Sequence, residues 1–294
     1  MLINTVGPFA GTSEPVVRAC VSASCHYVDV TAEQGFVEWA IDEIGPKAVG
    51  GEVSVVPASG LDYAPGDLLA TVAAGAVDAV REVHVAYYVP GALSMLRRSS
   101  AGTLRTLVSV IGRPMTARVA GERREEGIGQ ARRLAWFPRP VGPRHAAGAP
   151  GIEALTLPAR FGTVDVARTY LAMPSWQAEI AQFAGSLGRL KSVTGFLSRR
   201  TAGVRRGPDE TLRQSTRWAC VAEAEGTNGI ARAWAYGHDI YGFTAASSVL
   251  IAQRVAAGGC RSGVIGPADV GDPTGMLDEL ADITDLRWSL VRPR

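Results

Sequence analysis

The chain has 294 residues, of which 47% are hydrophobic and 20% are charged, with a formal net charge of +2. This balance is typical of a globular protein and excludes an intrinsically disordered one. No apolar run approaches the ~20 residues of a membrane-spanning helix, and the N-terminus lacks the basic segment of a secretory signal, so we expect a cytoplasmic protein. The four cysteines form no C-x-x-C pair and no cluster with histidine, which argues against a zinc site or a disulfide framework.

Charge is distributed unevenly along the chain. Residues 1–80 hold two basic and ten acidic side chains, a net charge of −8, which leaves +10 for the remainder. Basic residues concentrate between 118 and 144 and between 189 and 217. An arginine-rich surface attracts phosphate or an acidic carrier protein, but the same pattern also fits a solvated basic face. No nucleic-acid-binding motif accompanies these stretches, so we expect no nucleic-acid partner.

The first 80 residues alternate short apolar strands with amphipathic helices. Strands are predicted at 2–6, 27–30 and 52–57. Helices are predicted from Pro15, from Thr31 with capping-box spacing to Gln34, and from Asp67 to about Val80. This alternation predicts a parallel α/β sheet.

The pattern then changes to one that predicts antiparallel strands. A strand is predicted at 83–89, and the Gly-, Pro- and Arg-rich stretch 118–151 is expected to connect short strands. Residues 218–224 and 230–236 flank Gly226-Thr227-Asn228-Gly229, a strong hairpin signal. The elements that follow are a helix at 243–256 capped by Thr244, a short helix at 278–283 and a last strand at 288–291.

These elements predict an α/β fold with an incomplete Rossmann-like parallel sheet and a second, α+β domain with antiparallel strands. We expect residues 1–80 to be the C-terminal half of a dinucleotide-binding domain and residues 81–240 to form a substrate or dimerisation domain. The helical segment 241–294 is expected to pack back on the first domain.

Several segments of the chain carry a resemblance to a known family. Ile3-Asn4-Thr5-Val6-Gly7-Pro8-Phe9, with 14–20 and 26–29, resembles the later half of the Rossmann domain in saccharopine dehydrogenase-like oxidoreductases. Residues 60–68 resemble their next signature loop, and the similarity continues at 99–106, 136–138, 153–158, 237–245 and 263–267. Within this family, the chain resembles the trans-acting enoyl reductases of lipid and polyketide assembly. The resemblance implies an NAD(P)-dependent oxidoreductase with a small-molecule or lipid-like substrate.

The loop after the first strand is the main cofactor-binding candidate. In doubly wound sheets ligands bind beyond the carboxyl ends of the strands, where Asn4, Thr5 and a glycine would lie here. The resemblance implies that Val6, Gly7 and Pro8 lie along the nicotinamide-side ribose and phosphate; the alternative is an ordinary strand-to-helix turn. The cofactor-binding candidates are Asn4, Thr5, Val6, Gly7, Pro8 and Phe9, with Asp29 and Thr31 either at the cleft rim or only capping a helix.

The chain departs from the family in one respect. The family opens with a strand, a G-x-G-x-x-G turn and a helix whose N-terminus holds the pyrophosphate, and no segment of this form occurs here. We therefore expect an N-terminally truncated copy in which NADP or NAD binding is weak or absent. The alternative is a non-catalytic remnant or partner-binding module. An unpaired strand edge would also favour a homodimer.

Catalytic candidates lie in the loop that follows the third strand. Asp62, Tyr63 and Asp67 are expected to face the cofactor cleft, so that one of them delivers a proton to substrate, although packing or capping roles fit each as well. Tyr27 and Tyr241 are further donors. His26, His84 and His145 have no partner that indicates a metal site, so no metal is expected.

Overall fold

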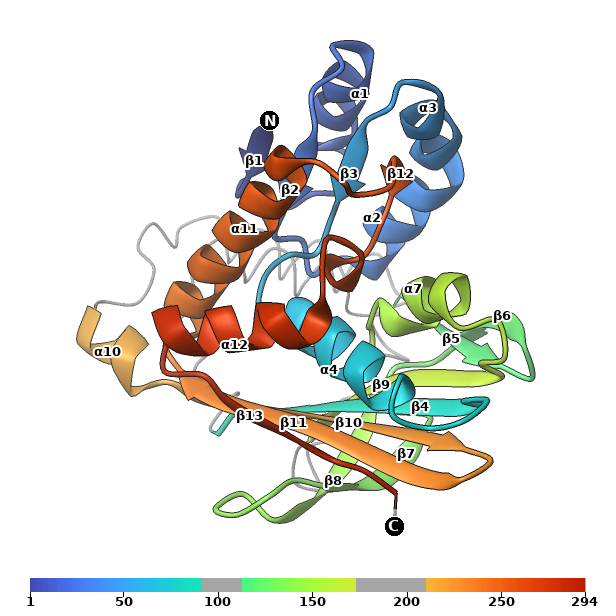
Figure 1. Cartoon of the computed structure of the whole chain (residues 1–294), viewed down its shortest axis with the longest axis vertical. Helices are drawn as coiled ribbons and strands as arrows, with labels where there is room; N and C mark the ends of the chain where they lie inside the picture. The colour runs from blue at the N-terminus through green and yellow to red at the C-terminus, as the bar shows by residue number, and fades with distance from the viewer. Residues whose placement is uncertain (91–112, 173–209, 294) are drawn as a thin grey trace, which may run out of the picture.

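The computed structural model describes residues 1–90, 113–172 and 210–293, which form two β-sheets with helices between them (Figure 1). The small sheet is entirely parallel, and its strands lie in the order β1 (Leu2–Asn4), β2 (Tyr27–Asp29), β3 (Ser54–Val56) and β12 (Gly263–Val264). The large sheet has nine strands and is mostly antiparallel. This architecture confirms the predicted α/β class with a parallel sheet and an antiparallel part.

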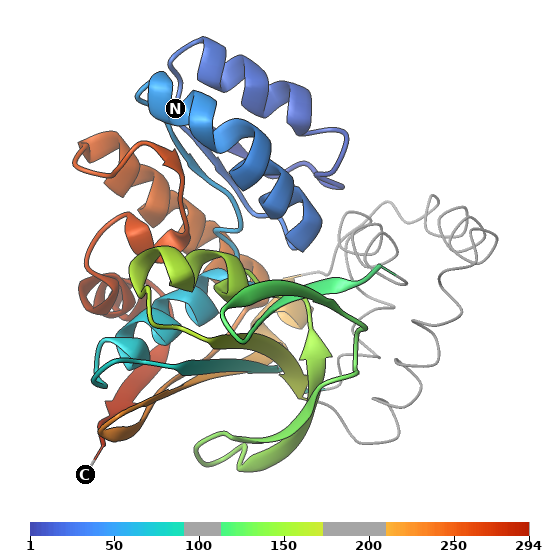
Figure 2. The same cartoon turned by 90° about the vertical axis from the view of Figure 1, so that its right-hand side faces the viewer.

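Both faces of the small sheet are covered. Tyr27 and Val55 pack beneath the helices that follow β1 and β2, whereas Val28 and Val56 face the core shared with the C-terminal helix. Because successive residues of a strand point to opposite faces, this double burial explains why these strands are continuous apolar runs. Figure 2 shows the sheet between the two groups of helices. The helices on one side of the small sheet are α1 (Glu14–Ser22), α2 (Gln34–Trp39), a π-helical turn (Ala40–Ile44) and α3 (Gly45–Gly50). The helix on the other side is α11 (Ile240–Ala257).

The large sheet has the order β13-β11-β10-β4-β9-β5-β6, with β8 also beside β9 and β7 beside β8. The predicted hairpin is confirmed: β10 and β11 pair from Arg217↔His238 to Gly226↔Gly229. The strands of the large sheet are β4 (Glu82–Tyr88), β5 (Met115–Val119), β6 (Glu122–Glu126), β7 (Arg132–Trp136), β8 (Pro143–Ala149), β9 (Val166–Ala172), β10 (Arg217–Gly226), β11 (Gly229–His238) and β13 (Arg287–Val291). The Gly-, Pro- and Arg-rich stretch therefore forms strands β5 to β8 joined by short turns.

Helices cover one face of the large sheet and a hairpin covers part of the other. Alternate residues of β10 and β11, such as Ala222 and Ala233, pack against α4 (Ala64–Ala74) and α12 (Pro273–Ile283). On the opposite face, Val221 and Tyr170 pack against Phe137, which follows β7. The remaining helical elements are α7 (Glu153–Arg160), α10 (Glu210–Ser215) and a 3-10 turn (Pro267–Asp269). None of the helices in the described ranges combines the length and apolar character needed to cross a bilayer.

Two predicted helix starts were wrong. The helix expected from Asp67 begins at Ala64, so Asp67 lies in its first turn, and it ends at Ala74. Thr31 and Gln34 form no capping box, because the Thr31 hydroxyl accepts a hydrogen bond from the N–H of Glu33 at 3.1 Å and α2 begins only at Gln34.

The cap of α11 was also assigned to the wrong residue. The helix begins at Ile240, and the carboxylate of Asp239 accepts a hydrogen bond from the N–H of Gly242 at 2.9 Å. Thr244 lies inside the helix, where its hydroxyl donates to the carbonyl of Ile240 and accepts from the N–H of Leu61. Thr244 therefore joins the helix to the loop after β3.

The C-terminal segment contributes to both sheets. Its strand β12 extends the small sheet beside β3, whereas β13 pairs with β11 at the edge of the large sheet. Helix α4, from the first 80 residues, packs on β10 and β11. The division of the chain at residues 80 and 240 stays a prediction.

Candidate functional site

The loops that follow β1, β2 and β3 meet at the carboxyl-end side of the small sheet, and two buried carboxylates join them. Glu33, directly before α2, accepts hydrogen bonds from the N–H groups of Phe9 at 2.7 Å and Ala10 at 3.0 Å. Asp29, at the end of β2, accepts from the N–H of Thr31 at 2.9 Å and of Ala58 at 3.0 Å. The first carboxylate fixes the β1 loop to the β2 loop, and the second fixes the β2 loop to the β3 loop.

Asn4 organises the start of the β1 loop from inside. Its amide nitrogen donates to the hydroxyls of Ser13 at 2.8 Å and Tyr27 at 3.0 Å, and its amide oxygen accepts from the N–H of Val6 at 3.0 Å. All of the amide's hydrogen-bonding atoms are thus engaged within the protein. Asn4 shapes the loop, and the side chain of Tyr27 is fully buried beneath it.

The exposed part of the β1 loop is the segment 5–8. Thr5 is exposed, the side chain of Val6 is 68% exposed, and Gly7 and Pro8 are half-buried, whereas Phe9 packs in the core. An exposed apolar side chain beside a glycine leaves a surface that a flat ring or a ribose can approach. Of the predicted cofactor-binding residues, Thr5, Val6, Gly7 and Pro8 are therefore the ones that a ligand can reach.

Asp29 and Thr31 do not line a rim, because both are buried within the loops. Burial raises the pKa of the Asp29 carboxyl to about 6, although the N–H groups of Thr31 and Ala58 stabilise its charged form. These contacts assign Asp29 to joining the ends of β2 and β3.

The three predicted catalytic residues have different surroundings. Asp62 is exposed, yet the protein surrounds it closely enough that desolvation raises the pKa of its carboxyl. Tyr63 is buried, and its hydroxyl donates to the carbonyl of Ala32 at 2.8 Å. Asp67 is completely buried and does not face the cleft. Of these three residues, Asp62 is the one that solvent reaches.

Asp67 belongs to a buried ion-pair cluster. Arg160, at the end of α7, donates to Asp67 at 2.7 and 2.8 Å and to Asp269 at 2.8 and 3.0 Å. Asp67 also accepts from the hydroxyl of Thr156 at 2.7 Å and the N–H of Ala268 at 2.9 Å. The cluster joins α4, α7 and the 3-10 turn, which gives Asp67 a structural role, and its catalytic role stays a prediction.

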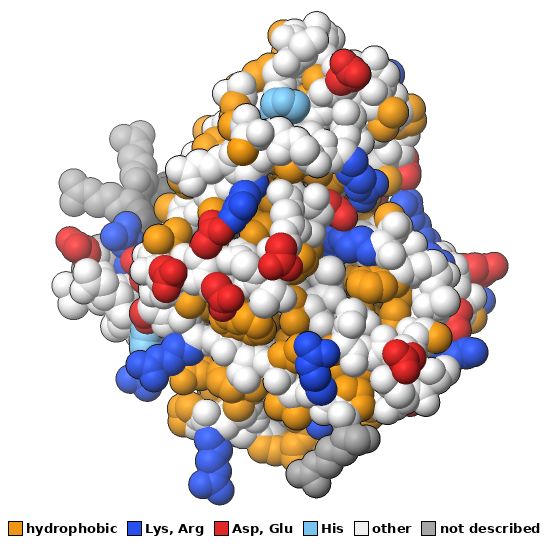
Figure 3. Space-filling model, viewed as in Figure 1, with side chains coloured by type: hydrophobic (Ala, Val, Ile, Leu, Met, Phe, Trp, Pro, Cys, Tyr) orange, Lys and Arg blue, Asp and Glu red, His pale blue; other side chains and the backbone are white. Residues whose placement is uncertain are grey.

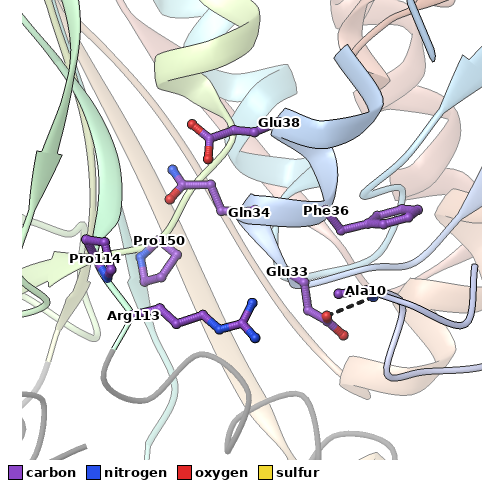
Figure 4. Close-up of a pocket in the computed structure, with 9 residues that line it drawn as sticks. Ala10, Glu33, Gln34, Phe36, Glu38, Arg113, Pro114 and Pro150 are labelled. Carbon is purple, nitrogen blue, oxygen red and sulfur yellow. Dashed lines mark hydrogen bonds between the residues drawn. The ribbon is translucent and has the colours of Figure 1, made fainter. Parts of the chain in front are cut away.

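A shallow pocket opens where α2 begins, between the two sheets (Figure 4). The guanidinium of Arg113 extends toward the carboxylate of Glu33, which points to the N–H of Ala10. The pocket lies between the β1 loop and the residues flanking β5 and β8, which makes it the recess of the carboxyl-end cleft. Its lining residues are Ala10, Glu33, Gln34, Gly35, Phe36, Glu38, Arg113, Pro114 and Pro150.

Gln34 holds the two sides of this cleft together. Its amide nitrogen donates to the carbonyls of Thr116 at 2.7 Å and Gly151 at 2.6 Å, and its amide oxygen accepts from the N–H of Thr116 at 2.8 Å. The side chain pairs with β5 as a neighbouring strand would. Gln34 therefore fixes the distance between the small sheet and the large sheet at the pocket.

A second acid lies in the core near the cleft. The side chain of Glu153 is fully buried; one oxygen accepts from the hydroxyl of Thr169 at 2.5 Å, and the other has no hydrogen-bond partner within the described residues. A Cβ at Gly66 would lie 2.5 Å from that second oxygen and 2.3 Å from the Tyr87 hydroxyl, so only glycine fits there. Burial raises the pKa of the Glu153 carboxyl to about 7, so the group carries a proton in neutral solution for much of the time.

Sequence reasoning missed Glu33, Gln34, Glu153 and Arg160. Glu33 had a usable signal, because it follows a buried strand at the edge where parallel strands end. The partners of Gln34, Thr116 and Gly151, lie 82 and 117 residues away along the chain. Asp67 and Asp269 lie 93 and 109 residues from Arg160. No spacing rule covers such pairs. The similarity expected at 99–106 and most of the basic stretch 189–217 lie outside the described residues.

On the face of the molecule seen in Figure 3, acidic side chains gather left of centre and basic side chains gather right of centre. The described residues also contain no group of three or more His, Cys, Asp or Glu side chains arranged to hold a metal ion.

Comparisons with known proteins agree with this geometry. No family model matches the chain. A Mycobacterium tuberculosis protein described as a trans-acting enoyl reductase is 35% identical over 68 residues, which are 23% of this chain and 16% of that protein. A human saccharopine dehydrogenase-like oxidoreductase is 32% identical over 68 residues, again 23% of this chain and 16% of that protein. The match thus spans about a sixth of the length of these relatives.

The full-length likeness is structural. The fold matches yeast saccharopine dehydrogenase (L-Glu forming) with a TM-score of 0.55 over 98% of this chain and 84% of that one, at 11% identity. The chain shares the fold of saccharopine dehydrogenase. At this identity the structural match establishes the fold alone, and the sequence similarity is confined to 68 residues.

An NAD(P) dinucleotide in this cleft would need hydrogen-bond donors for its pyrophosphate and an open surface for its nicotinamide ring and ribose. A pyrophosphate needs backbone N–H donors, usually at a helix N-terminus. Here the helix after β1 begins with Glu14 and Pro15, a carboxylate and a residue without an N–H, and Glu33 already occupies the N–H groups of Phe9 and Ala10. These donors do not fit a pyrophosphate, whereas the segment 5–8 is accessible to solvent.

Proposed function

We propose that the chain is the nicotinamide-side part of an NAD(P)-dependent reductase that acts on a double bond in a lipid or polyketide intermediate. The observation that carries this proposal is the accessible segment 5–8 at the carboxyl end of β1, in a fold that matches saccharopine dehydrogenase. The 68-residue similarity to a trans-acting enoyl reductase supports the choice of substrate class.

In this proposal the chain's own residues orient the reactants. Thr5, Val6, Gly7 and Pro8 form the surface on which the nicotinamide and its ribose lie, and Asn4 and Glu33 hold that loop in place through the hydrogen bonds described above. Gln34 fixes the opposite wall of the cleft. A bound NAD(P)H supplies a hydride, and the protein supplies position and electrostatics.

Asp62 is the proposed proton donor. Reduction of a polarised carbon–carbon double bond takes a hydride at one carbon and a proton at the other. The raised pKa of the Asp62 carboxyl favours the protonated form that such a donor needs, and its exposure allows contact with the substrate. A general acid of this kind contributes about 100-fold to 10,000-fold to rate.

The experiment is an assay of NADPH consumption with a short 2-enoyl thioester at high cofactor concentration. The wild-type chain is expected to oxidise NADPH only when the thioester is present. The D62N variant should lose about 100-fold or more of that rate, while D165N, which alters an exposed acid next to β9, should keep it. Equal rates for D62N and wild type would exclude Asp62 as the donor.

A second candidate is a partner-binding module that does not bind dinucleotide. The acidic, proline-containing start of α1 favours it, since within the described ranges no G-x-G-x-x-G turn leads from a strand into a helix. In that case NADPH would not be consumed with any thioester, and a dihydronicotinamide titration would show no saturable binding.

A further inference from the structure

The C-terminus of α1 ends in a motif that brings two cysteines together. The N–H of Cys25 donates to the carbonyl of Cys20 at 2.8 Å, and the N–H of Ser24 donates to the carbonyl of Val21 at 3.2 Å. Ser24 has a φ of +51°, in the left-handed region. These are the two nested hydrogen bonds and the left-handed residue of a Schellman motif.

In a Schellman motif the side chains at the two ends of the longer hydrogen bond contact each other. Those positions are ordinarily apolar, and here both are cysteines. Both are free cysteines, and the motif places them at its two contacting positions. The backbone of the motif therefore presents a dithiol whose two members are held side by side.

The two thiols differ in access. Cys20 packs in the core beneath α1 with 6% of its surface exposed, and burial, together with the neighbouring Cys25, raises the pKa of its thiol. Cys25 is half-buried, and its sulfur lies 3.5 Å from the carbonyl of His26. An oxidant from solvent therefore meets Cys25 first, with Cys20 behind it.

The other two cysteines lack such a neighbour. Cys220 is fully buried within β10, and the sulfur of Cys260 lies 3.4 Å from the carbonyl of Val270. Neither is paired with a second thiol, so they serve as internal references.

We propose that Cys20 and Cys25 form a peroxide-oxidisable dithiol, a modification site that closes to a disulfide in the folded chain. The Cys25 thiolate attacks one oxygen of hydrogen peroxide, the O–O bond breaks, and the leaving hydroxide takes up a proton as water. The sulfur of Cys20 then attacks the Cys25 sulfenic acid while its thiol proton passes to the departing oxygen; the S–S bond forms, the S–O bond breaks, and a second water leaves. The dithiol is oxidised by two electrons and the peroxide is reduced by two, and both thiol protons end in water.

The disulfide would close the connection between α1 and β2. Cys25 lies two residues before Tyr27, whose hydroxyl accepts a hydrogen bond from Asn4 in the β1 loop. Oxidation would thus stiffen the chain where it enters the strand that supports that loop. The site stands independently of the proposed reductase activity, because its geometry depends only on the end of α1.

The test is mass spectrometry of the folded chain after graded hydrogen peroxide and alkylation of the remaining thiols. Trypsin releases Cys20 and Cys25 in one peptide, 19–47, because no Lys or Arg lies between Arg18 and Lys47. This peptide is expected to lose two hydrogen atoms and resist alkylation, and to recover both on treatment with dithiothreitol. The peptides holding Cys220 and Cys260 should stay unoxidised at the same dose.

Two variants and one condition make the result decisive. With C20S, Cys25 should gain oxygen and react with a sulfenic-acid trap, since no thiol remains to resolve it; with C25S, Cys20 should stay reduced. In urea, disulfide formation should slow, because the motif that joins the thiols is lost. The proposal is overturned if the folded wild type accumulates oxygen on Cys25 while Cys20 stays alkylatable, if both thiols stay reduced, or if urea speeds the disulfide.

Discussion

Glu153 makes the stability of the fold depend on pH, and E153Q should remove that dependence. The carboxyl is fully buried, one oxygen has no partner among the described residues, and burial raises its pKa from 4.5 to about 7. The unfolded chain releases this proton near pH 4.5 and the folded chain only near pH 7. At 1.36 kcal/mol per pKa unit, this one group costs about 3 kcal/mol of unfolding free energy above pH 7.

The sign follows from proton binding. Between about pH 4.5 and about pH 7 the native state holds a proton that the unfolded state has lost, so the wild type becomes less stable as pH rises through this window. Glutamine keeps the shape and an acceptor for Thr169 but cannot ionise. E153Q should therefore resemble wild type at about pH 4.5 and exceed it by about 3 kcal/mol at about pH 8.

Urea denaturation at several pH values measures this difference directly. The control is E225Q, the same substitution at an exposed position of β10, which should follow the wild-type curve. If E153Q and wild type lose stability in parallel as pH rises, the carboxyl is not held protonated and the reasoning fails.

Three further substitutions probe the ion-pair cluster, the cleft and a buried histidine. R160M should lower the free energy of unfolding, measured by urea denaturation, by about 3–5 kcal/mol, because it leaves two buried carboxylates without their partner. The control is R81M, whose arginine side chain is 67% exposed in its ion pair; it should change the free energy of unfolding by less than about 1 kcal/mol. Q34L should speed amide hydrogen exchange at Thr116, because it removes the side-chain oxygen that accepts from this N–H; unchanged exchange would contradict the proposed hold on the cleft. Burial, and then Arg133, lowers the pKa of His84 from 6.5 to about 3, so the neutral ring contributes fully to the free energy of unfolding above pH 6.5, and this contribution is lost as pH falls. H84Q should therefore flatten the acid side of the stability curve. An NMR titration showing the ring protonated near pH 6 would refute this.

The sequence predicted the elements whose pattern is local. The strands at 27–30 and 52–57 were recognisable because both faces are buried, which leaves continuous apolar runs. The β10–β11 hairpin was recognisable because Gly226 and Gly229 flank its turn. Helix α12 was expected only from 278, since the signal at its true start, Asp272 accepting from the N–H groups of Thr274 and Gly275, was overlooked.

Features that depend on distant segments could not be predicted. Strand β12 has two residues, too few for any periodicity, and is defined only by its pairing with β3. Asp67 was expected in the cleft because its loop follows a strand, but Arg160 from α7 draws it into the core. The candidate site shows the same limit: the accessible segment 5–8 follows from a strand end, whereas the roles of Glu33 and Gln34 required their partners.

The central claim, that segment 5–8 receives the nicotinamide half of NAD(P)H, is tested most directly by a fluorescence titration with dihydronicotinamide mononucleotide beside NADPH. The account predicts saturable binding of both with similar affinity, because the described residues offer no fitting donors for the pyrophosphate. V6D should abolish this binding, while I283D, at an equally exposed apolar residue on α12, should leave it unchanged. Absence of binding, or equal binding by V6D and wild type, would contradict the account.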